Sequence, residues 1–514
     1  MVKSDSLQRS LTTVAKGATI VFAGMVAGKI LGTVNQILLG RLMGPEDYGR
    51  FNIVLSVISI AFSIATFGLF GALARFIPFN LKLNRLDNVK SVIDFSAGFV
   101  LVTCSLAAAV IFIFSDRIAA GFFHDSELAP LLRVFSIGMP VIGLNRVCIG
   151  MVRGFKAVKL NAIIFNVANR IIKILIFLLF VALGYRLYGA IFAFIGSAVA
   201  TVIISIWFVR NRLFVEYSDC SRVPIARKIL GFSWPLALTG LTFLFVSKTD
   251  MMLLGYFLDS KHVGIYTPAI MIAKLLIFIG MAFKFIFLPV VSEFFAHDDI
   301  EGLRSLYKST SKWIVLIVLP GLIFFVLFPR DILRLLYGSE FTAGYLALII
   351  LSCGISMDVF QGTSGNILVG SGYTKLNLLG EVIAAVSNVI LNIILIPAYG
   401  ITGAAIATSL SYLFRNISFV TIVYKKLGIH PYKRSYLYVL ASSLIVLVLV
   451  YILKIYSPLQ WWINMIVLGI LMTVAYFVTL LLTGSFDEND LVVVEGLERK
   501  TGLRLGFLKK YINR

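Results

Sequence analysis

The sequence has little charge and few of the side chains that build catalytic centres. Charged residues make up 14% of its 514 positions, whereas a soluble domain carries about 25%. The four histidines lie between apolar runs and lack the spacing of metal ligands. There is no GxSxG motif, no nucleotide-binding loop and no close pair of carboxylates within an apolar run. We therefore expect no catalytic residue, no metal site and no bound cofactor.

Cysteine is also scarce, and the shortage of acidic residues leaves the chain strongly basic. Cys104, Cys148 and Cys353 fall in apolar runs and Cys220 in a loop, so no disulfide framework is predicted. Lys and Arg outnumber Asp and Glu by 46 to 25. In a soluble protein this excess would indicate a nucleic-acid partner. In a chain that is 59% hydrophobic it indicates basic cytoplasmic loops, and no nucleic acid is expected.

Long apolar runs dominate what is present. A helix of about 20 residues crosses the roughly 30 Å hydrocarbon core of a bilayer. The sequence therefore predicts an all-α polytopic membrane protein with about fourteen transmembrane helices. The predicted spans are 14–39, 52–77, 92–114, 131–151, 160–183, 187–209, 229–254, 264–290, 312–328, 343–368, 376–396, 401–424, 436–456 and 462–483.

The second half of the chain repeats the first. Leu-Leu-Gly at 38–40, followed by Gly49, returns about 215 residues later as Leu-Leu-Gly at 253–255, followed by Gly264. Lys-Leu-Asn at 159–161 returns at 375–377. Two matches in order at one offset indicate a duplication that pairs spans one to six with spans seven to twelve. The predicted domains are a six-helix half at 1–215, a second at 216–430, two additional helices at 431–485 and a cytoplasmic tail at 486–514.

Loop charge sets the predicted orientation. Most Lys and Arg outside the spans lie on the side that carries both termini, so this side is cytoplasmic, in the cell membrane of a bacterium or archaeon. The tail is either a solvated segment or a surface helix on anionic lipid. Two parallel six-helix repeats usually enclose a site near the bilayer midplane and rock around it. The architecture thus favours a transporter over an enzyme.

Charged side chains inside the spans mark the candidate site. A charge at the bilayer centre costs about 2.5–3.5 kcal/mol on insertion scales, so it faces protein or water, or reaches out to the headgroups. Bases near mid-span predict a wet or ligand-filled cavity; they are Lys29, Arg170, Lys173 and Lys274. Bases nearer a cytoplasmic end can reach the headgroups instead; they are Arg75, Arg146, Lys284 and Arg415.

Span one indicates how a cavity would form. Gly24, Gly28 and Gly32 recur every four residues and predict a face for close helix packing. Lys29 lies beside this face, with Gln36 two turns further along the same stripe. A helix that packs closely on one side and presents Lys and Gln on the next is predicted to line a wet space.

Polar stripes on other spans have two explanations. Span five carries Asn166, Arg170 and Lys173, and span eleven carries Asn377, Glu381, Asn388 and Asn392. These groups either line the cavity or hydrogen-bond neighbouring helices. In span seven, Lys248 and Asp250 lie on nearly opposite faces, so at most one points to the cavity, and we favour Asp250. If a Na⁺ or H⁺ is coupled to transport, the candidate acids are Asp250, Asp358 and Glu381.

Three motifs carry a family resemblance. GRLMGPEDYGRFN at 40–52, FGLFGALARFIP at 67–78 and RGFKAVKLNA at 153–162 resemble the polysaccharide transporters of the multidrug/oligosaccharidyl-lipid/polysaccharide exporter superfamily. The duplicated six-span halves and the two added spans are also similar, so the resemblance covers essentially the whole chain. Its motifs are loose, and they identify a family rather than a substrate.

The resemblance implies a flippase that moves polyprenyl-(pyro)phosphate-linked oligosaccharide across the cytoplasmic membrane by alternating access, for cell-surface polysaccharide or glycoconjugate assembly. Its implied partners are the lipid-linked oligosaccharide, the bilayer, and glycosyltransferases or polymerases of the same pathway. Family members have a cavity lined by bases from spans one, two, seven and eight. The matching residues here are Lys29, Arg75, Lys248, Asp250, Lys274 and Lys284. A cationic cavity suits a phosphate group, and amides suit sugar hydroxyls.

Two other classes of function stay open. A cation-coupled multidrug exporter of the same superfamily would need acids in its cavity, and this chain has few. A membrane glycan polymerase or ligase would need a large outside loop, whereas the longest here is 115–130. The sugar, the isoprenoid, the coupling ion and the oligomeric state are not specified by the sequence.

Overall fold

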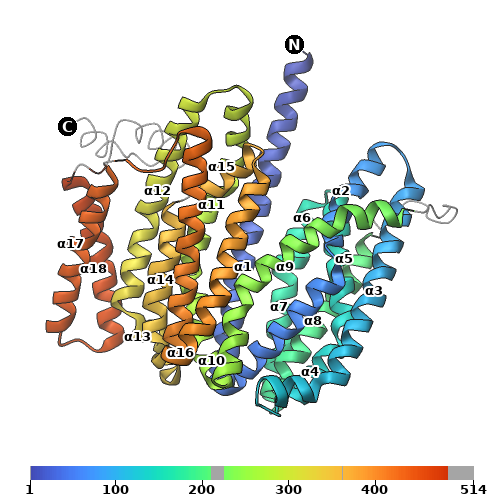
Figure 1. Ribbon diagram of the computed structural model, residues 1–514, viewed down its shortest axis with the longest axis horizontal. Coiled ribbons are helices and arrows are strands. Elements are labelled where there is room, and N and C mark those ends of the chain that lie inside the picture. Colours follow the sequence, from blue (N-terminus) through green and yellow to red (C-terminus); the bar gives the residue numbers. More distant parts are fainter. Residues whose placement is uncertain (1, 210–224, 362, 434, 484, 486–514) are drawn as a thin grey trace. The chain divides into compact units, whose positions relative to one another are not determined.

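The computed structural model describes residues 2–209, 225–361, 363–433, 435–483 and 485, and this part of the chain is helical, without a strand (Figure 1). The helices are α1 (Val2–Thr66), α2 (Leu69–Lys82), α3 (Leu86–Asp116), η1 (Arg117–Phe122), α4 (Leu128–Ile137), α5 (Met139–Gly154), α6 (Val158–Asn161), η2 (Ala162–Ala168), α7 (Asn169–Ala182), α8 (Arg186–Phe208), α9 (Ala226–Phe257), α10 (Ser260–Ala273), α11 (Leu275–Ala296), α12 (Ile300–Leu327), α13 (Pro329–Leu336), η4 (Ser339–Gly344), α14 (Tyr345–Phe360), α15 (Ser364–Gly370), α16 (Thr374–Leu427), α17 (Ser435–Tyr456) and α18 (Trp461–Leu482). The predicted tail at 486–514 lies outside the described residues.

Two of these helices bend between two predicted spans. α1 bends at Gly44 (φ 79°, ψ 171°), between the first and second predicted spans. α16 bends at Gly400 (φ 57°, ψ −134°), between the eleventh and twelfth. Both glycines adopt a positive φ, which glycine alone reaches at little cost. Pro45 follows Gly44 directly and suits the first turn of the helix that resumes there. Single glycine kinks thus replace the short loops that we expected.

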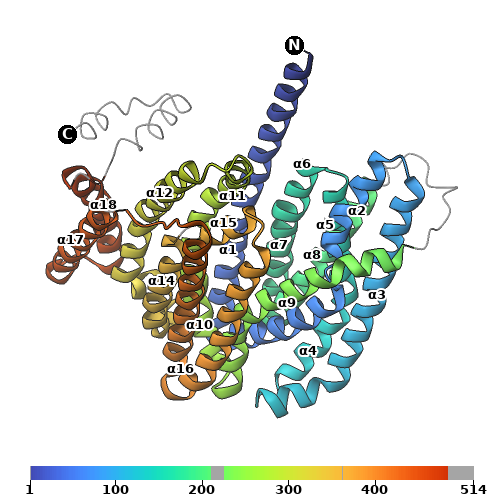
Figure 2. The same cartoon turned by 45° about the horizontal axis from the view of Figure 1, so that its top comes forward.

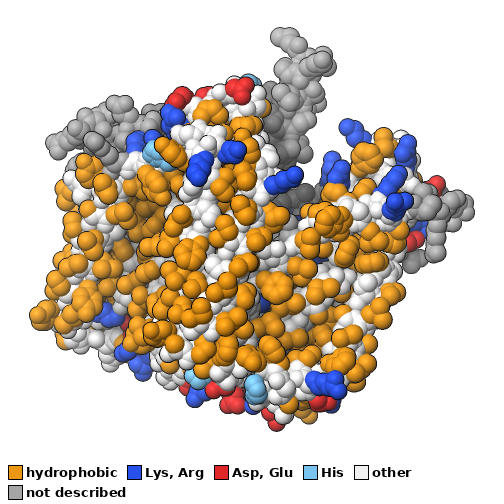
Figure 3. Space-filling view, in the orientation of Figure 1, with side chains coloured by type: hydrophobic (Ala, Val, Ile, Leu, Met, Phe, Trp, Pro, Cys, Tyr) orange, Lys and Arg blue, Asp and Glu red, His pale blue; other side chains and the backbone are white. Residues whose placement is uncertain are grey.

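The described helices confirm the all-α polytopic architecture. Ten helical segments are long and apolar enough to cross a membrane, or up to twelve if each of two bent pairs is one span. Two of the ten are the double helices α1–α2 and α16, so each of the fourteen predicted ranges has a helical counterpart. Figure 3 shows hydrophobic side chains over the middle of the helices, with Lys, Arg, Asp and Glu gathered towards their ends. The chain is a multi-pass membrane protein.

Contacts divide the chain into an N-terminal unit, Met1–Gly264, and a C-terminal unit, Ile265–Arg514. By its contacts α9 belongs to the N-terminal unit, where it packs against α1 and α2. In the sequence repeat, however, α9 pairs with the first half of α1. The repeat boundaries at 215 and 430 stay a prediction.

The two copies of the repeated motif lie against each other within the N-terminal unit. A Cβ on Gly49 would overlap the carbonyl of Ser260 and lie 2.9 Å from the amide nitrogen of Gly264. A Cβ on Gly264 would in turn overlap the carbonyl of Pro45. Beside this crossing, Asp125 accepts from Arg50 Nε at 3.0 Å and from Ser260 Oγ at 2.7 Å. Backbone packs directly on backbone here, and only glycine allows that.

In the C-terminal unit, α17 and α18 form a hairpin beside α12 (Figures 1 and 2). Tyr476 of α18 is buried and donates its hydroxyl to the carbonyl of Leu316 at 2.9 Å. Lys454 of α17 lies 3.3 Å from the carboxylate of Asp331 in α13. These contacts fix the two helices that lie outside the sequence repeat.

Candidate functional site

Gly24, Gly28 and Gly32 of α1 let η2 and the start of α7 pack closely against α1. An added Cβ on Gly24 would lie 2.7 Å from Ala162 Cβ, and one on Gly28 would lie 2.9 Å from Asn166 Cβ. At Gly32 an added Cβ would lie 3.6 Å from Arg170 Cζ. The predicted close-packing face is confirmed, and its partners are η2 and the start of α7. The missing side chain at Gly32 leaves space for the Arg170 guanidinium.

Four bases gather in the N-terminal unit, and we call them the basic cluster: Lys29 of α1, Arg146 of α5, and Arg170 and Lys173 of α7. Lys29 is half-buried, and the charge of Arg170 acts on it. Lys173 is only 7% exposed, and the charges of Arg170 and Arg146 both act on it. In the part of the chain that the structure describes, no carboxylate pairs with any of the four. The cluster therefore concentrates uncompensated positive charge.

Neutral groups surround Lys173, the most buried residue of the basic cluster. Lys173 Nζ lies 3.6 Å from the centre of the Phe194 ring, a cation–π contact that offsets part of the loss of hydration. A cavity of about 30 Å³ beside it is lined by Asn35, Gln36, Arg170 and Lys173, among others. Gln36 accepts a hydrogen bond from the Tyr48 hydroxyl at 2.9 Å. Gln36 thus lines this small cavity, and its role in binding a substrate stays a prediction.

Such an arrangement suits a ligand with several anionic oxygens. Like charges held close together repel one another, and an anion bound among them offsets that repulsion. Guanidinium groups bind phosphate oxygens in pairs, and ammonium groups add point charges. The basic cluster can therefore bind a phosphate or pyrophosphate group.

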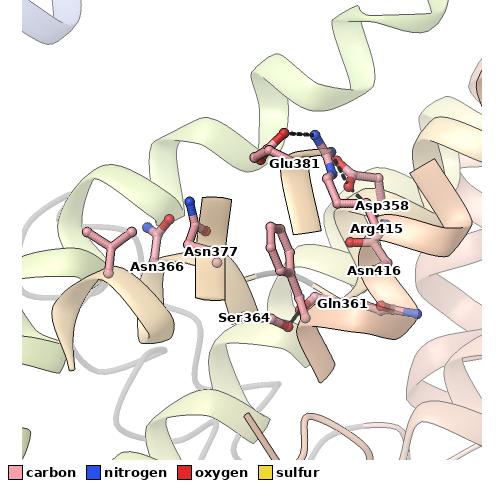
Figure 4. Close-up of a pocket in the computed structure, with 11 residues that line it drawn as sticks. Asp358, Gln361, Ser364, Asn366, Asn377, Glu381, Arg415 and Asn416 are labelled. Carbon is pink, nitrogen blue, oxygen red and sulfur yellow. Dashed lines mark hydrogen bonds and ion pairs between the residues drawn. The ribbon is translucent and has the colours of Figure 1, made fainter. Parts of the chain in front are cut away.

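The C-terminal unit contains a different polar pocket, with a volume of about 280 Å³ (Figure 4). Its walls come from α14, α15, α16 and the link between α14 and α15. The lining residues are Asp358, Gln361, Ser364, Gly365, Asn366, Val369, Asn377, Glu381, Arg415, Asn416 and Phe419. We call this the amide pocket, since Asn and Gln are its most frequent side chains.

An ion network closes one side of the amide pocket. Arg415 Nη2 lies 2.5 Å from Asp358 Oδ1, and its Nη1 lies 3.3 Å from Glu381 Oε2. Asn416 Nδ2 donates to the same Asp358 oxygen at 2.9 Å. Asp358 is 6% exposed and Arg415 stacks on the Tyr412 ring at 4.8 Å. The predicted coupling acids Asp358 and Glu381 are thus brought together by a guanidinium.

The polar residues of span eleven were predicted either to line a cavity or to hydrogen-bond neighbouring helices, and both arrangements occur. Asn388 and Asn392 are fully buried; Asn388 Nδ2 donates to Thr408 Oγ1 at 3.2 Å, and Asn392 Nδ2 donates to the Asn388 carbonyl at 2.8 Å. For these two, hydrogen bonding within and between helices is confirmed. Glu381 and Asn377, about two and three turns before Asn388, line the amide pocket instead.

The other predicted site residues lie outside the basic cluster and the amide pocket. Arg75 of α2 is exposed and stacks on the Phe232 ring at 4.4 Å. In α9, Lys248 is half-buried and Asp250 is 1% exposed. Lys274 lies at the break between α10 and α11. The Lys284 side chain lies outside the described residues. The assignment of these residues to a binding cavity stays a prediction.

Sequence reasoning missed two central bases. Arg146 and Arg415 were expected to reach the headgroups, because both lie within a few turns of a predicted cytoplasmic end. Arg146 is exposed and lies close enough to Arg170 and Lys173 for their charges to act on one another, and Arg415 joins Asp358 and Glu381. The pairing of Arg415 with Asp358 had a signal in the sequence, since both charges occur in apolar spans where an isolated charge is costly.

Comparison with known proteins decides the family. A family model described as "Polysaccharide biosynthesis protein" matches residues 14–295, more than half of the chain. The chain belongs to the polysaccharide biosynthesis protein family. A second model, MatE, matches residues 235–394. The predicted membership in the multidrug/oligosaccharidyl-lipid/polysaccharide exporter superfamily is confirmed, and the chain is a transporter rather than an enzyme.

Relatives of this polysaccharide biosynthesis protein extend over most of its length. It is 24% identical to the "Probable low-salt glycan biosynthesis flippase Agl15" of Haloferax volcanii, over 80% of this chain and 85% of that protein. It is 24% identical to the "Probable flippase AglR" of the same organism, over 93% and 98%. A solved structure, "Lipid II flippase MurJ, inward closed conformation", matches 90% of this chain and 98% of its own with a TM-score of 0.71. At 18% identity, that likeness shows the fold alone.

Proposed function

We propose that this protein is a flippase that moves a polyprenyl-(pyro)phosphate-linked oligosaccharide across the cell membrane by alternating access. The observation that carries the proposal is the basic cluster. Positive charge inside a membrane span without a carboxylate partner is costly unless a ligand or water compensates it, and Lys173, which is 7% exposed, is the strongest case. A lipid-linked sugar phosphate supplies the matching negative charge, and the name of one relative, a "Probable low-salt glycan biosynthesis flippase", supports a glycan as the cargo.

The orientation and the driving force are part of the proposal. Both termini lie on the cytoplasmic side, as the distribution of basic loops favours. Outward movement of an anionic head group is assisted by an inside-negative membrane potential, at about 2.3 kcal/mol per charge and 100 mV. A Na⁺ or H⁺ gradient, acting through Asp250, Asp358 or Glu381, is the other source of energy. The enzymes that build and polymerise the glycan are the proposed pathway partners.

The test is flipping of a fluorescent polyprenyl-pyrophosphate oligosaccharide in proteoliposomes. We expect the double variant Lys29→Ala/Arg170→Ala to flip about 100-fold more slowly than the unmodified protein, because a hydrogen bond to a charged group contributes about 1.5–3 kcal/mol. The matched control is Lys82→Ala, which removes an exposed charge at the end of α2 and should leave the rate unchanged.

Two results would contradict the proposal. One is a double variant that flips as fast as Lys82→Ala. The other is an unmodified protein that flips no lipid-linked sugar but exports a cationic dye when a proton or sodium gradient is applied. The second result would favour a multidrug exporter.

A further inference from the structure

The amide pocket contains buried polar atoms that have no partner within the protein. Gln361 Oε1 and Arg415 Nε are both buried, and neither has a hydrogen-bond partner among the described residues. An unpaired buried polar group costs about 1–3 kcal/mol. Both residues line the pocket, and an occupant bonds to these two atoms once their side chains turn towards it.

The charges of the pocket exclude an anion. Asp358 and Glu381 contribute two negative charges and Arg415 one positive charge, so the walls have a net charge of the same sign as a phosphate. A bare cation would also bind weakly, because the carboxylates that would hold it already bind the Arg415 guanidinium, at 2.5 Å and 3.3 Å. The ligand that fits is neutral and offers both donors and acceptors.

The remaining walls have the chemistry that recognises a sugar. Figure 4 shows Asn366 and Asn377 next to each other at one end of the pocket and the ion network at the other. Each amide offers donors and an acceptor, as vicinal hydroxyl groups require. Phe419, 6% exposed, adds an apolar wall of the kind that contacts the C–H face of a sugar ring. The volume of about 280 Å³ is just below the range of drug-sized sites and has space for a single small unit.

We propose that the amide pocket binds one neutral sugar unit of the glycan head group, through Gln361, Asn377 and Arg415. The inference rests on the proposed function and adds a division of labour to it. The basic cluster binds the phosphate that every substrate of the class carries, whereas the amide pocket discriminates among sugars.

The experiment measures binding to the full chain in lipid nanodiscs. The probes are geranylgeranyl pyrophosphate and a panel of geranylgeranyl-pyrophosphate-linked neutral oligosaccharides of increasing length, so that the test assumes no particular separation between the two sites. We expect at least one sugar-linked probe to bind about 10-fold more tightly than geranylgeranyl pyrophosphate, and Gln361→Ala/Asn377→Ala to abolish this ratio. The variant should bind geranylgeranyl pyrophosphate itself within about twofold of the unmodified protein, which also shows that it is folded.

The matched control is Ser387→Ala, on the same helix as Asn377. Its hydroxyl is bonded to carbonyls of its own helix at 2.7 Å and 3.1 Å and does not line the pocket. This variant should keep the full ratio. A Gln361→Ala/Asn377→Ala protein that keeps the ratio, or an unmodified protein that prefers none of the sugars, overturns the sugar pocket.

Failure of the proposed function gives a different result. In that case geranylgeranyl pyrophosphate either does not bind or binds equally well to Arg170→Ala. A third pattern, in which sodium alters probe binding and the double variant abolishes only the sodium effect, would identify the occupant as a cation and overturn the sugar assignment.

Discussion

Replacing Gly49 with alanine is expected to lower the melting temperature of the protein sharply and to reduce the yield of folded material. The new Cβ would overlap the Ser260 carbonyl and lie 2.9 Å from the amide nitrogen of Gly264. Both neighbours are backbone atoms, so no side chain can rotate away and the two segments must separate. Overpacking of this kind costs about 1–3 kcal/mol or more. Gly264→Ala, which would overlap the Pro45 carbonyl, should have the same effect.

Gly98→Ala is the matched control for this prediction. Gly98 lies in α3, is exposed, and has no atom within 4 Å of the place where a Cβ would be. Alanine favours a helix over glycine by about 0.8–1 kcal/mol, so this variant should be unchanged or slightly more stable. Size-exclusion chromatography of the detergent-solubilised protein after heating measures all three variants. Equal melting temperatures for Gly49→Ala and Gly98→Ala would show that the two motif copies do not pack as described.

Replacing Arg415 with methionine is expected to destabilise the C-terminal unit by about 3–5 kcal/mol, since breaking a buried ion pair by removing one partner leaves an uncompensated charge. Here two carboxylates lose their partner, and one of them, Asp358, is 6% exposed. Methionine keeps much of the apolar volume, so the effect reports charge more than packing. Thermal unfolding followed by the same chromatographic assay measures it.

Charge neutralisation distinguishes this cause from a simple packing defect. Asp358→Asn and Glu381→Gln, added to Arg415→Met, remove the stranded charges and should restore most of the stability. Arg330→Met is the matched control, because Arg330 is exposed and stacks on the Tyr345 ring at 4.0 Å. It should change stability much less. A triple variant no more stable than Arg415→Met would contradict the account of the ion network.

The membrane fold was predictable because hydrophobic length carries the signal. Each of the fourteen predicted ranges overlaps a described helix, and Gly24, Gly28 and Gly32 pack as their spacing indicated. The kinks at Gly44 and Gly400 were not predicted. The sequence does not distinguish a glycine at a helix kink from a glycine in a loop. Whether helix continues on both sides of the glycine depends on tertiary packing.

The candidate site was only partly predictable, because the depth of a residue along a span does not specify which neighbouring helix its side chain faces. Arg170 and Lys173 were expected in a cavity and do form part of the basic cluster. Arg146 lies nearer a predicted membrane surface. Its distance along the span does not decide whether the side chain reaches the headgroups or lies beside other bases. The position of Arg146 depends on how α5 packs against α2, α3 and α8, and those contacts join segments that the sequence does not relate.

The grouping of α9 with the N-terminal unit has a consequence for biosynthesis. α1 receives this packing partner only after the ribosome has added roughly 200 further residues, which takes on the order of 10–40 s at about 5–20 residues per second. During that interval the surface of α1 that α9 will cover meets lipid, or whatever insertion factor shields it. The newly made N-terminal unit is therefore incomplete in the bilayer until α9 has been inserted, and this is when membrane quality-control proteases would most readily recognise it.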